Sequence, residues 1–374
     1  GDVYKRQAMM FRIIYPRINI VYATNSITSW CYRCSFEVVS TRLSNYARKY
    51  LGVSMPVTYS PDAGTSIYIG DLLNVAHDGL AMSYPNATYW LDTPFVARTG
   101  VKYGSLPRKL IVTSHWNFYV AKYLGASPRV IPRAVDDDIA DKVFRDVTEG
   151  RIQKRFDIVV VVTGSHNAKY KEHELVYYLL KDLGLLSKSF LVCDEPWCHR
   201  RLFTMTAEEL YTTIAMGRIF LALTDSEGFG LPPAEAMSVG VPVVHFGSPF
   251  TSAPYEVYGD SVDMTDYGTP RSGDVDVNDM AEFVFDHTYP AYDNILHFAV
   301  PVYDFKLTEA NHSPGRYYYK PMSAYDDIVR VVNEALSWAK YEKRDVIEEE
   351  QLKLHDHVRK YFYHDRIVKE LVRQ

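Results

Sequence analysis

Two glutamates flank a glycine-rich turn in the segment SEGFGLPPAEAMSVGVPVV, residues 226–244. The preceding stretch RIFLALTD (218–225) is apolar and predicts a buried strand. Gly228 and Gly230 allow a tight turn after it and let main-chain N–H groups approach a ligand closely. The Pro-Pro pair suits the first turn of a helix, because the backbone N–H groups there have no acceptor within the helix. Gly240 is a typical helix end. We therefore expect a strand, a tight loop and a helix in direct succession.

The beginning of such a helix favours a bound anion. We expect the backbone N–H groups of Phe229, Gly230 and Leu231 to form this anion site, with Glu227 just before the loop and Glu235 in the first helical turn. Carboxylates accept hydrogen bonds from hydroxyl groups, and sugars and riboses present hydroxyls in pairs. The motif thus predicts a site for a nucleotide-diphosphate sugar, with Glu235 on the ribose and Glu227 on the donor sugar. A plain strand–helix turn with a capping glutamate is the alternative.

Short apolar segments alternate with amphipathic ones through most of the chain, which predicts parallel sheets wrapped by helices. The strands that we expect are 18–25, 53–60, 86–93, 109–114, 129–132, 156–164, 189–194, 218–225 and 241–246. The helices that we expect are 31–52, 115–125, 173–184, 206–217 and 324–343. The fold class is therefore α/β, with two Rossmann-like, doubly wound parallel-sheet domains facing a central cleft.

Composition divides the chain into parts. The expected parts are an N-terminal Rossmann-like domain at 10–134, a linker at 135–154, a C-terminal Rossmann-like, nucleotide-sugar-binding domain at 155–343 with an insertion at 262–314, and a helical segment at 344–374. We expect the last segment to be broken around Tyr363 and His364. The first seven residues, GDVYKRQ, back-translate into a sequence like a transposon end used in sequencing libraries, so they are left out and Met9 or Met10 is the candidate start.

The chain has an ordinary globular composition, with 47% hydrophobic and 23% charged residues among 374. No apolar run reaches the roughly 18 residues of a membrane span, and no secretory signal is visible, so a cytoplasmic location is expected. Residues 1–134 carry 15 Lys and Arg against 6 Asp and Glu, whereas the rest carries 26 against 40. A basic first domain could face an anionic acceptor or lie peripherally at a membrane, although solubility is the simpler interpretation. Dense basic clusters with interleaved aromatics are lacking, so we expect no nucleic-acid partner.

The pattern E-G-F-G-L-P-P-x-E-A-M-x-x-G-x-P-V-V at 227–244 is similar to the signature of the retaining GT-B glycosyltransferases, the group 1 family related to glycogen and sucrose synthases. The segment 109–136 resembles the one that closes the family's first domain, with Arg133 and Ala134 in place of Asn-Gly. The segments YEVYGD (255–260), GRYYYKP (315–321) and VRKYFYHDRIVKEL (358–371) resemble later parts of the family. The likeness covers about two thirds of the chain. The 30 tyrosines resemble the composition of proteins from hot-acid archaea and their viruses.

The resemblance implies further residues around the donor phosphates. In the family, a Gly-Arg pair and then a Lys-Gly pair follow the first strand of the second domain. The corresponding residues here are Gly164, Ser165 in place of the arginine, Lys169 and Lys171, of which Lys171 is the better match. Glu172 stands where glycine is usual. A lysine supplies a compact positive charge to a departing phosphate.

The resemblance also implies that residues 10–134 form the acceptor-side domain and that the segment 344–374 crosses back to it. It further assigns individual residues to the acceptor and sugar side. The loop NSITSW (25–30) stands where the family often has paired glycines, which points to Asn25 and Ser26. Leu91 or Asp92 falls near the position of a family histidine that faces the donor sugar, and Asp92 is the polar candidate.

Two cysteine pairs have spacings that zinc could use only if the pairs met in space. Cys31 and Cys34 fall in the first domain, however, and Cys193 and Cys198 in the second, so we expect packed or free thiols and no disulfide framework. The run DDD at 136–138 suits helix capping better than metal binding. No dinucleotide or Walker motif is present. We therefore expect no metal and no cofactor, with a nucleotide-diphosphate sugar as donor substrate.

The expected function is transfer of a sugar from a nucleotide-diphosphate donor to the hydroxyl of an unidentified glycan, lipid or protein acceptor. The resemblance implies a metal-independent, front-face mechanism that retains the anomeric configuration, with Glu227 and Lys171 as the catalytic residues. A non-catalytic nucleotide-sugar or glycan-binding module of the same fold is the alternative, because the arginine and the paired glycines are missing. A sugar epimerase or a phosphorylase is a third hypothesis.

Overall fold

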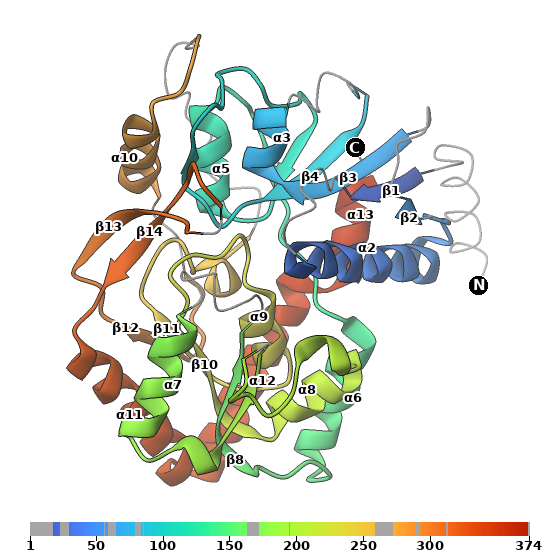
Figure 1. Cartoon of the computed structure of the whole chain (residues 1–374). Helices are drawn as coiled ribbons and strands as arrows, with labels where there is room; N and C mark the ends of the chain where they lie inside the picture. The colour runs from blue at the N-terminus through green and yellow to red at the C-terminus, as the bar shows by residue number, and fades with distance from the viewer. Residues whose placement is uncertain are drawn as a thin grey trace. The chain divides into compact units, whose positions relative to one another are not determined.

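The computed structural model describes residues 18–22, 30–55, 57–58, 65–78, 84, 86–162, 172–193, 195–258, 272–288, 292–311 and 313–372. The chain divides into two compact units. The first comprises residues 1–134, 258–288 and 364–374, and the second comprises residues 135–257 and 289–363. Each unit contains a parallel sheet with helices packed on it (Figure 1).

The first unit is built on a six-stranded parallel sheet in the order β2-β1-β3-β4-β6-β7. The strands are β1 (Ile18–Tyr22), β2 (Val57–Thr58), β3 (Thr65–Asp71), β4 (Thr88–Asp92), β6 (Leu110–Val112) and β7 (Arg129–Val130), and the short β5 (Ala97–Arg98) lies outside this sheet. The helices are α2 (Trp30–Leu51), α3 (Leu72–Asp78), α5 (His115–Tyr123), α10 (Val277–His287) and α13 (His364–Val372). This unit thus gathers elements from the beginning, the middle and the end of the chain.

Ring contacts fix the two late helices of this unit. The rings of Tyr46 in α2 and His364 in α13 are stacked with their centroids 4.4 Å apart. Helix α10 lies beside α5 (Figure 1), where the rings of Tyr123 and Phe283 are 5.2 Å apart. Aromatic pairs at such distances add to the stabilisation by apolar burial.

The second unit is built on a five-stranded parallel sheet in the order β12-β11-β10-β8-β9. The strands are β8 (Phe156–Val161), β9 (Ser189–Val192), β10 (Gly217–Ala222), β11 (Val243–Phe246) and β12 (His297–Val300), and β13 (Asp304–Glu309) and β14 (Arg316–Met322) pair as antiparallel strands. The α-helices are α6 (Asp137–Thr148), α7 (His173–Asp182), α8 (Ala207–Ala215), α9 (Leu231–Ser238), α11 (Tyr325–Tyr341) and α12 (Arg344–Phe362). Short 3₁₀ turns occur at Leu186–Lys188, Leu202–Thr204 and Ala253–Tyr255.

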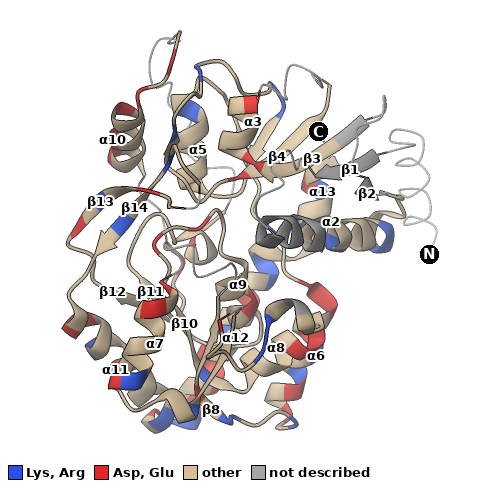
Figure 2. Ribbon diagram, viewed as in Figure 1, with Lys and Arg blue, Asp and Glu red and all other residues tan. Residues whose placement is uncertain are grey.

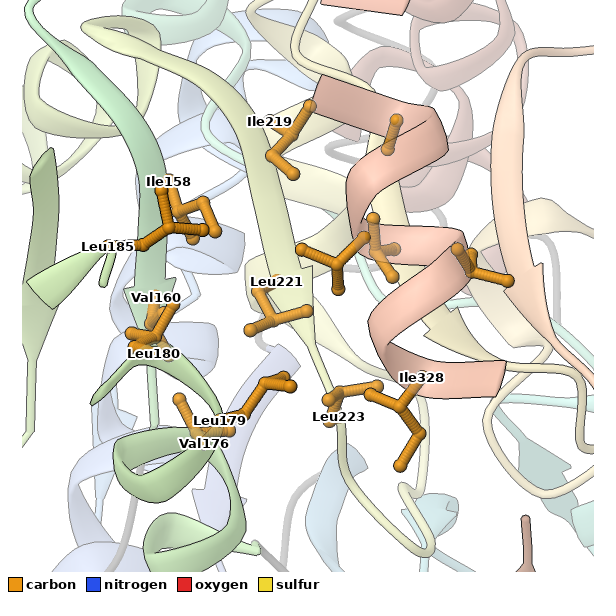
Figure 3. Packing of buried hydrophobic residues seen from close by; sticks show 14 of the residues in the cluster. Ile158, Val160, Val176, Leu179, Leu180, Leu185, Ile219, Leu221, Leu223 and Ile328 are labelled. Carbon is orange, nitrogen blue, oxygen red and sulfur yellow. The ribbon is translucent and has the colours of Figure 1, made fainter. Parts of the chain in front are cut away.

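The core of the second unit follows from the two-residue period of its strands. Ile158 and Val160 of β8 lie on the face that α7 and α11 cover, together with Leu221 of β10 (Figure 3). Val159, on the opposite face, lies against Gly217 of β10 on the side of α8. Full burial of each such aliphatic side chain stabilises the fold by about 1.5–3 kcal/mol. Charged residues of both signs are interspersed on the helices around this core (Figure 2).

Several local expectations are confirmed. The α/β alternation with parallel sheets is present in both units. Thr206 caps α8 in a capping box with Glu209. Helix α12 ends at Phe362 and α13 begins at His364, because the backbone of Tyr363 between them is extended, with ψ 144°. No helix among the described residues is long and apolar enough to cross a membrane.

The segment expected to be a linker, 135–154, contains helix α6. Asp136 caps this helix by accepting a hydrogen bond from the N–H of Ile139, as the capping interpretation of the DDD run predicts. The acidic first turn is favourable at the positive end of the helix dipole. Ala140 and Val143 are buried on one face of the helix. Because most of the segment is polar, this narrow apolar stripe did not stand out as a helix signal in the sequence.

The insertion expected at 262–314 is also more regular than its sequence suggests. It contains helix α10, edge strand β12 and strand β13, and α10 belongs to the first unit. Strand β3, which was not expected, pairs with both β1 and β4 in the first sheet. The sequences of β3, β12 and β13 have weak hydrophobic periodicity. These strands can be assigned only from their pairing with neighbouring strands.

Cys193 and Cys198 form a disulfide, with Cα atoms 5.6 Å apart, which corrects the expectation of free or separately packed thiols. The chain turns back directly after β9, and the backbone N–H of Cys198 donates to the carbonyl of Glu195. This turn brings the two cysteines within bonding reach. The side chains of Cys31 and Cys34 lie outside the described residues.

Candidate functional site

The strand order of the second unit indicates which edge of its sheet is suited to a ligand. From β8 the chain continues through α7 to β9, and from β9 it returns through α8 to β10, which pairs with the other side of β8. Helices α7 and α8 cover opposite faces of the sheet (Figure 1). In open parallel sheets, ligands bind outside the carboxyl ends of the strands at such a switch point. The glycine-rich loop follows β10 at this edge.

Backbone and ring contacts hold the loop in place. The backbone N–H of Glu227 donates to the carbonyl of Phe250 at 2.9 Å. The buried ring of Phe229 packs edge-on against Phe362 of α12, with ring centroids 5.2 Å apart. Gly230 has φ +91° and directly precedes α9. This left-handed conformation lets the chain turn from the loop into the helix.

The loop presents donors for an anion. Within the described part of the chain, the backbone N–H groups of Phe229, Gly230 and Leu231 have no hydrogen-bond acceptor. Pro232 and Pro233 follow as the second and third residues of α9 and have no N–H to offer. The unpaired donors therefore lie at the helix terminus, where the dipole is positive. The geometry suits a phosphate that several N–H groups bind together.

Replacing Gly230 by alanine is expected to damage this terminus. A Cβ there would lie 3.1 Å from Cγ of Pro254, at a φ that side-chain-bearing residues rarely adopt. We expect Gly230→Ala to lower the free energy of unfolding by about 1–3 kcal/mol, as measured by chemical denaturation. Gly184→Ala is the matched control, because its φ is also positive, at +65°, but no atom lies within 4 Å of the added Cβ. An equal loss in both variants would contradict a specific strain at Gly230.

Glu235 lies deeper in the helix than its sequence position suggested. Helix α9 begins at Leu231, so Glu235 is its fifth residue, and the first turn contains no acidic residue. The side chain is only 4% exposed and accepts a hydrogen bond from the hydroxyl of Tyr211 at 3.3 Å. That hydroxyl in turn accepts from the backbone N–H of Asp136 at 2.9 Å. The carboxylate is therefore held by a network that reaches α6 and α8.

Glu227 is half-buried at the edge of the sheet. It lines a small hollow at the carboxyl ends of β8 and β10 together with Val162, Leu223, Thr224, Pro232 and Pro233. Tyr255 lies nearby, fully buried, and burial raises the pKa of its phenol, with Tyr292 and Glu227 acting in the same direction. The structure thus brings Glu227, the anion donors and Glu235 into one loop–helix segment.

Two histidines, His245 and His297, support this loop–helix segment from behind. The ring of Tyr255 is stacked on His245, with centroids 4.1 Å apart. Nδ1 of His245 donates to the carbonyl of Phe246 at 2.6 Å, so its Nε2 accepts from Nδ1 of His297 at 2.8 Å. Burial lowers the pKa of His245 to about 3, with His297 adding to the effect. The pair therefore stays neutral at ordinary pH and acts as a rigid support.

A second group of polar residues at the same edge escaped sequence reasoning. Asp225, two residues before Glu227, is 1% exposed. Its carboxyl lies beside that of Glu172, which directly precedes α7. Nζ of Lys320 in β14 donates to Oε1 of Glu172. Burial raises the pKa of Asp225 to about 9, the charge of Glu172 contributes in the same direction, and Lys320 acts in the opposite direction. No motif joins these three residues in sequence.

Glu172 also accounts for an unusual position in the sequence. Its φ is +50°, and it is the one non-glycine residue with positive φ among the described residues. Glycine is the usual residue in such a conformation, and glycine is what the resembling family has at this position. The Glu172 side chain accepts from Nζ of Lys320, a contact that glycine at this position could not make.

The other predicted site residues fall into two groups. Residues Asn25, Ser26, Gly164, Ser165, Lys169 and Lys171 lie outside the described residues. Asp92 is described, at the end of β4, where its carboxylate accepts from Nε of Arg133 at 3.1 Å. Arg133 is buried and its guanidinium lies 4.4 Å from the ring centre of Trp90. Asp92 therefore neutralises a buried cation, and its assignment to the sugar side stays a prediction.

Comparison with known proteins gives the family. The chain is 31% identical over 411 aligned residues, covering 97% of this chain and 98% of the relative, to the "Putative glycosyltransferase ORF378" of Acidianus filamentous virus 2 (isolate Italy/Pozzuoli). The chain belongs to the glycosyltransferases. This glycosyltransferase is also 27% identical, over 65% of its length, to the "Putative glycosyltransferase 63" of Sulfolobus islandicus filamentous virus (isolate Iceland/Hveragerdi), of which it covers 83%. Both relatives come from viruses of archaea.

Solved structures agree with the fold. The crystal structure of a glycosyltransferase from Rickettsia africae ESF-5 superposes with a TM-score of 0.51 at 9% identity, covering 96% of this chain and 97% of that one. At this identity the likeness concerns the fold alone, and the mixed α/β architecture with parallel sheets is that of the GT-B glycosyltransferases. No protein-family model matches the glycosyltransferase.

Proposed function

We propose that this glycosyltransferase takes its sugar from a nucleoside-diphosphate sugar and retains the anomeric configuration. The observation that carries the proposal is the loop–helix segment after β10. Unpaired N–H groups at Phe229, Gly230 and Leu231, within the described part of the chain, are flanked by the carboxylates of Glu227 and Glu235, at the switch point of a parallel sheet. The N–H groups suit a diphosphate, and the carboxylates suit the hydroxyls of a ribose and a hexose.

The proposed roles follow from burial. Glu235 is buried and oriented by Tyr211, which suits a fixed contact to the ribose diol. Glu227 is half-buried in the hollow at the strand ends, which suits a contact to the transferred sugar. The departing phosphate would help to deprotonate the acceptor hydroxyl on the same face of the sugar. Loop N–H groups and the dipole of α9 would stabilise the charge that develops on that phosphate.

The proposed mechanism uses no metal, and Lys171 is proposed as the cation beside the leaving phosphate. The acceptor is proposed to be a hydroxyl of a glycan, a lipid or a protein. We expect transfer to continue at an unchanged rate in the presence of excess EDTA. A loss of transfer that added Mg²⁺ or Mn²⁺ restores would contradict this part of the proposal.

Nucleotide binding tests the proposal directly. A thermal-shift panel would compare UDP, GDP, ADP, dTDP and CMP, their common sugar conjugates, and NAD as a control, on the wild type and on Glu235→Ala. We expect one nucleoside diphosphate and its sugar conjugate to stabilise the wild type, by about 2.7 kcal/mol at a ligand concentration of about 100 times Kd. With a 10- to 100-fold weaker affinity, Glu235→Ala should keep only about 1.4 to 0.4 kcal/mol of this stabilisation. Absence of a response to every nucleotide would overturn the proposed donor class.

A further inference from the structure

The proximity of Asp225 and Glu172 favours a proton on one of them. The two carboxyl groups lie close enough for Glu172 to raise the pKa of Asp225, and two ionised carboxylates repel each other at short distance. A proton on one of the pair removes this repulsion and can be shared between them. Asp225 is the better candidate, because its side chain is 1% exposed and its Oδ2 has no hydrogen-bond partner among the described residues. A buried carboxylate with an unpartnered oxygen is strongly unfavourable.

The charges around the pair agree with this assignment. Glu172, in front of α7, is the more exposed of the two acids and receives the ammonium of Lys320 from β14. Tyr318, also on β14, faces the same pair, and burial together with Asp225 and Glu172 raises the pKa of its phenol, so it stays neutral. A neutral Asp225, an ionised Glu172 and a charged Lys320 give the cluster a net charge of zero.

The cluster lies where a donor phosphate would arrive. Asp225 follows β10 and Glu172 precedes the helix that follows β8, so both stand at the carboxyl edge of two paired strands. Asp225 is also two residues before Glu227 in the loop that ends at the anion donors. A cluster with a second ionised carboxylate would be negative and would repel a diphosphate. A neutral cluster leaves the positive potential of the loop undiminished.

We propose that Asp225, Glu172 and Lys320 form a proton-sharing cluster of zero net charge that positions the donor loop and makes it receptive to an anionic donor. Asp225 is a positioning residue in this arrangement and touches no reacting atom. The part of the inference that concerns the donor rests on the proposed function. The part that concerns the shared proton rests on the contacts of the three residues alone.

Stability as a function of pH tests the shared proton without any substrate. Asp225 in the unfolded chain ionises above about pH 4, whereas in the folded protein its raised pKa keeps the proton until about pH 9. The unfolded state therefore binds fewer protons in this window, and the contribution of Asp225 to stability falls as pH rises from about 4 to about 9. Asparagine mimics the protonated acid and does not titrate. We expect the Tm of Asp225→Asn minus that of the wild type to grow steadily through this window and to level off outside it.

Neighbouring variants should move the window in opposite directions. Glu172→Gln removes a negative charge beside Asp225, so the upper limit of the window should shift to lower pH. Lys320→Met removes a positive charge, so the limit should shift to higher pH. Asp182→Asn removes another carboxyl of α7, which accepts from the hydroxyl of Tyr325, and is the control for removing a negative charge from this helix. A Tm difference between Asp225→Asn and the wild type that is independent of pH would overturn the shared proton.

Donor affinity as a function of pH tests whether the cluster makes the loop receptive to the donor. With the nucleoside diphosphate that the thermal-shift panel identifies, we expect wild-type affinity to fall above about pH 9 by up to about tenfold per pH unit. Asp225→Asn should bind as tightly as the wild type at neutral pH and should lack this alkaline fall. Identical profiles for the two proteins would overturn the role in donor binding and leave the proposed function standing. If no nucleotide binds at any pH, the proposed function and the donor role both fail, while the Tm series still decides the shared proton.

Discussion

Glu227→Ala is expected to reduce sugar transfer by about 100-fold while nucleoside-diphosphate binding stays within a few-fold of the wild type. Glu227 lines the hollow at the ends of β8 and β10 and is assigned to the sugar. Hydrogen bonds from neutral hydroxyls to a charged acceptor contribute about 1.5–3 kcal/mol each, and a misplaced sugar loses further rate through poor alignment with the acceptor. Steady-state transfer kinetics and calorimetric titration of the diphosphate would measure the two effects separately.

Two controls make this result interpretable. Glu227→Gln keeps the volume of the side chain and one acceptor oxygen, so it should retain part of the lost activity. Glu208→Gln changes an exposed carboxylate on α8 whose partner is Lys142, and it should leave transfer unchanged. Equal weakening of diphosphate binding and transfer in Glu227→Ala would show that this glutamate binds the nucleotide, and the two assigned roles would have to be exchanged.

Glu235→Ala is expected to weaken binding of the nucleoside diphosphate by about 10- to 100-fold. This range corresponds to the loss of a charged acceptor that holds two ribose hydroxyls, at about 1.4 kcal/mol for each factor of ten. A 2′,3′-dideoxynucleoside diphosphate offers no ribose diol, so its affinity should be the same for the wild type and the variant. Isothermal titration with both ligands measures this difference directly. An equal loss for both ligands would contradict the ribose assignment.

Tyr211→Phe separates the position of Glu235 from its charge. The substitution removes the hydroxyl that donates to Glu235 and accepts from the N–H of Asp136, and it leaves the carboxylate in place. We expect a loss in affinity of about 2- to 10-fold, because the carboxylate remains and loses only one hydrogen bond that orients it. A loss as large as that of Glu235→Ala would mean that the buried network, and not the carboxylate itself, controls the ribose site.

Much of the local structure could be predicted from the sequence. The strand before Glu227, the turn at Gly228 and Gly230 and the helix that ends just before Gly240 are all present, because glycine, proline and apolar runs act on their own backbone and nearest neighbours. The cap of α8 by Thr206 has the same local origin. The anion donors lie at the beginning of α9, which these local elements specify.

Features that depend on distant partners could not be predicted. Lys320 and Glu172 are 148 residues apart in sequence, and neither carries a motif that points to the other. Likewise, the buried position of Glu235 depends on Tyr211 of another helix. The proton between Asp225 and Glu172 depends on burial and on neighbouring charge, which arise only when β8, β10 and β14 assemble. A local pattern specifies backbone conformation, whereas the electrostatic state of a side chain is set by whatever the folded chain packs around it.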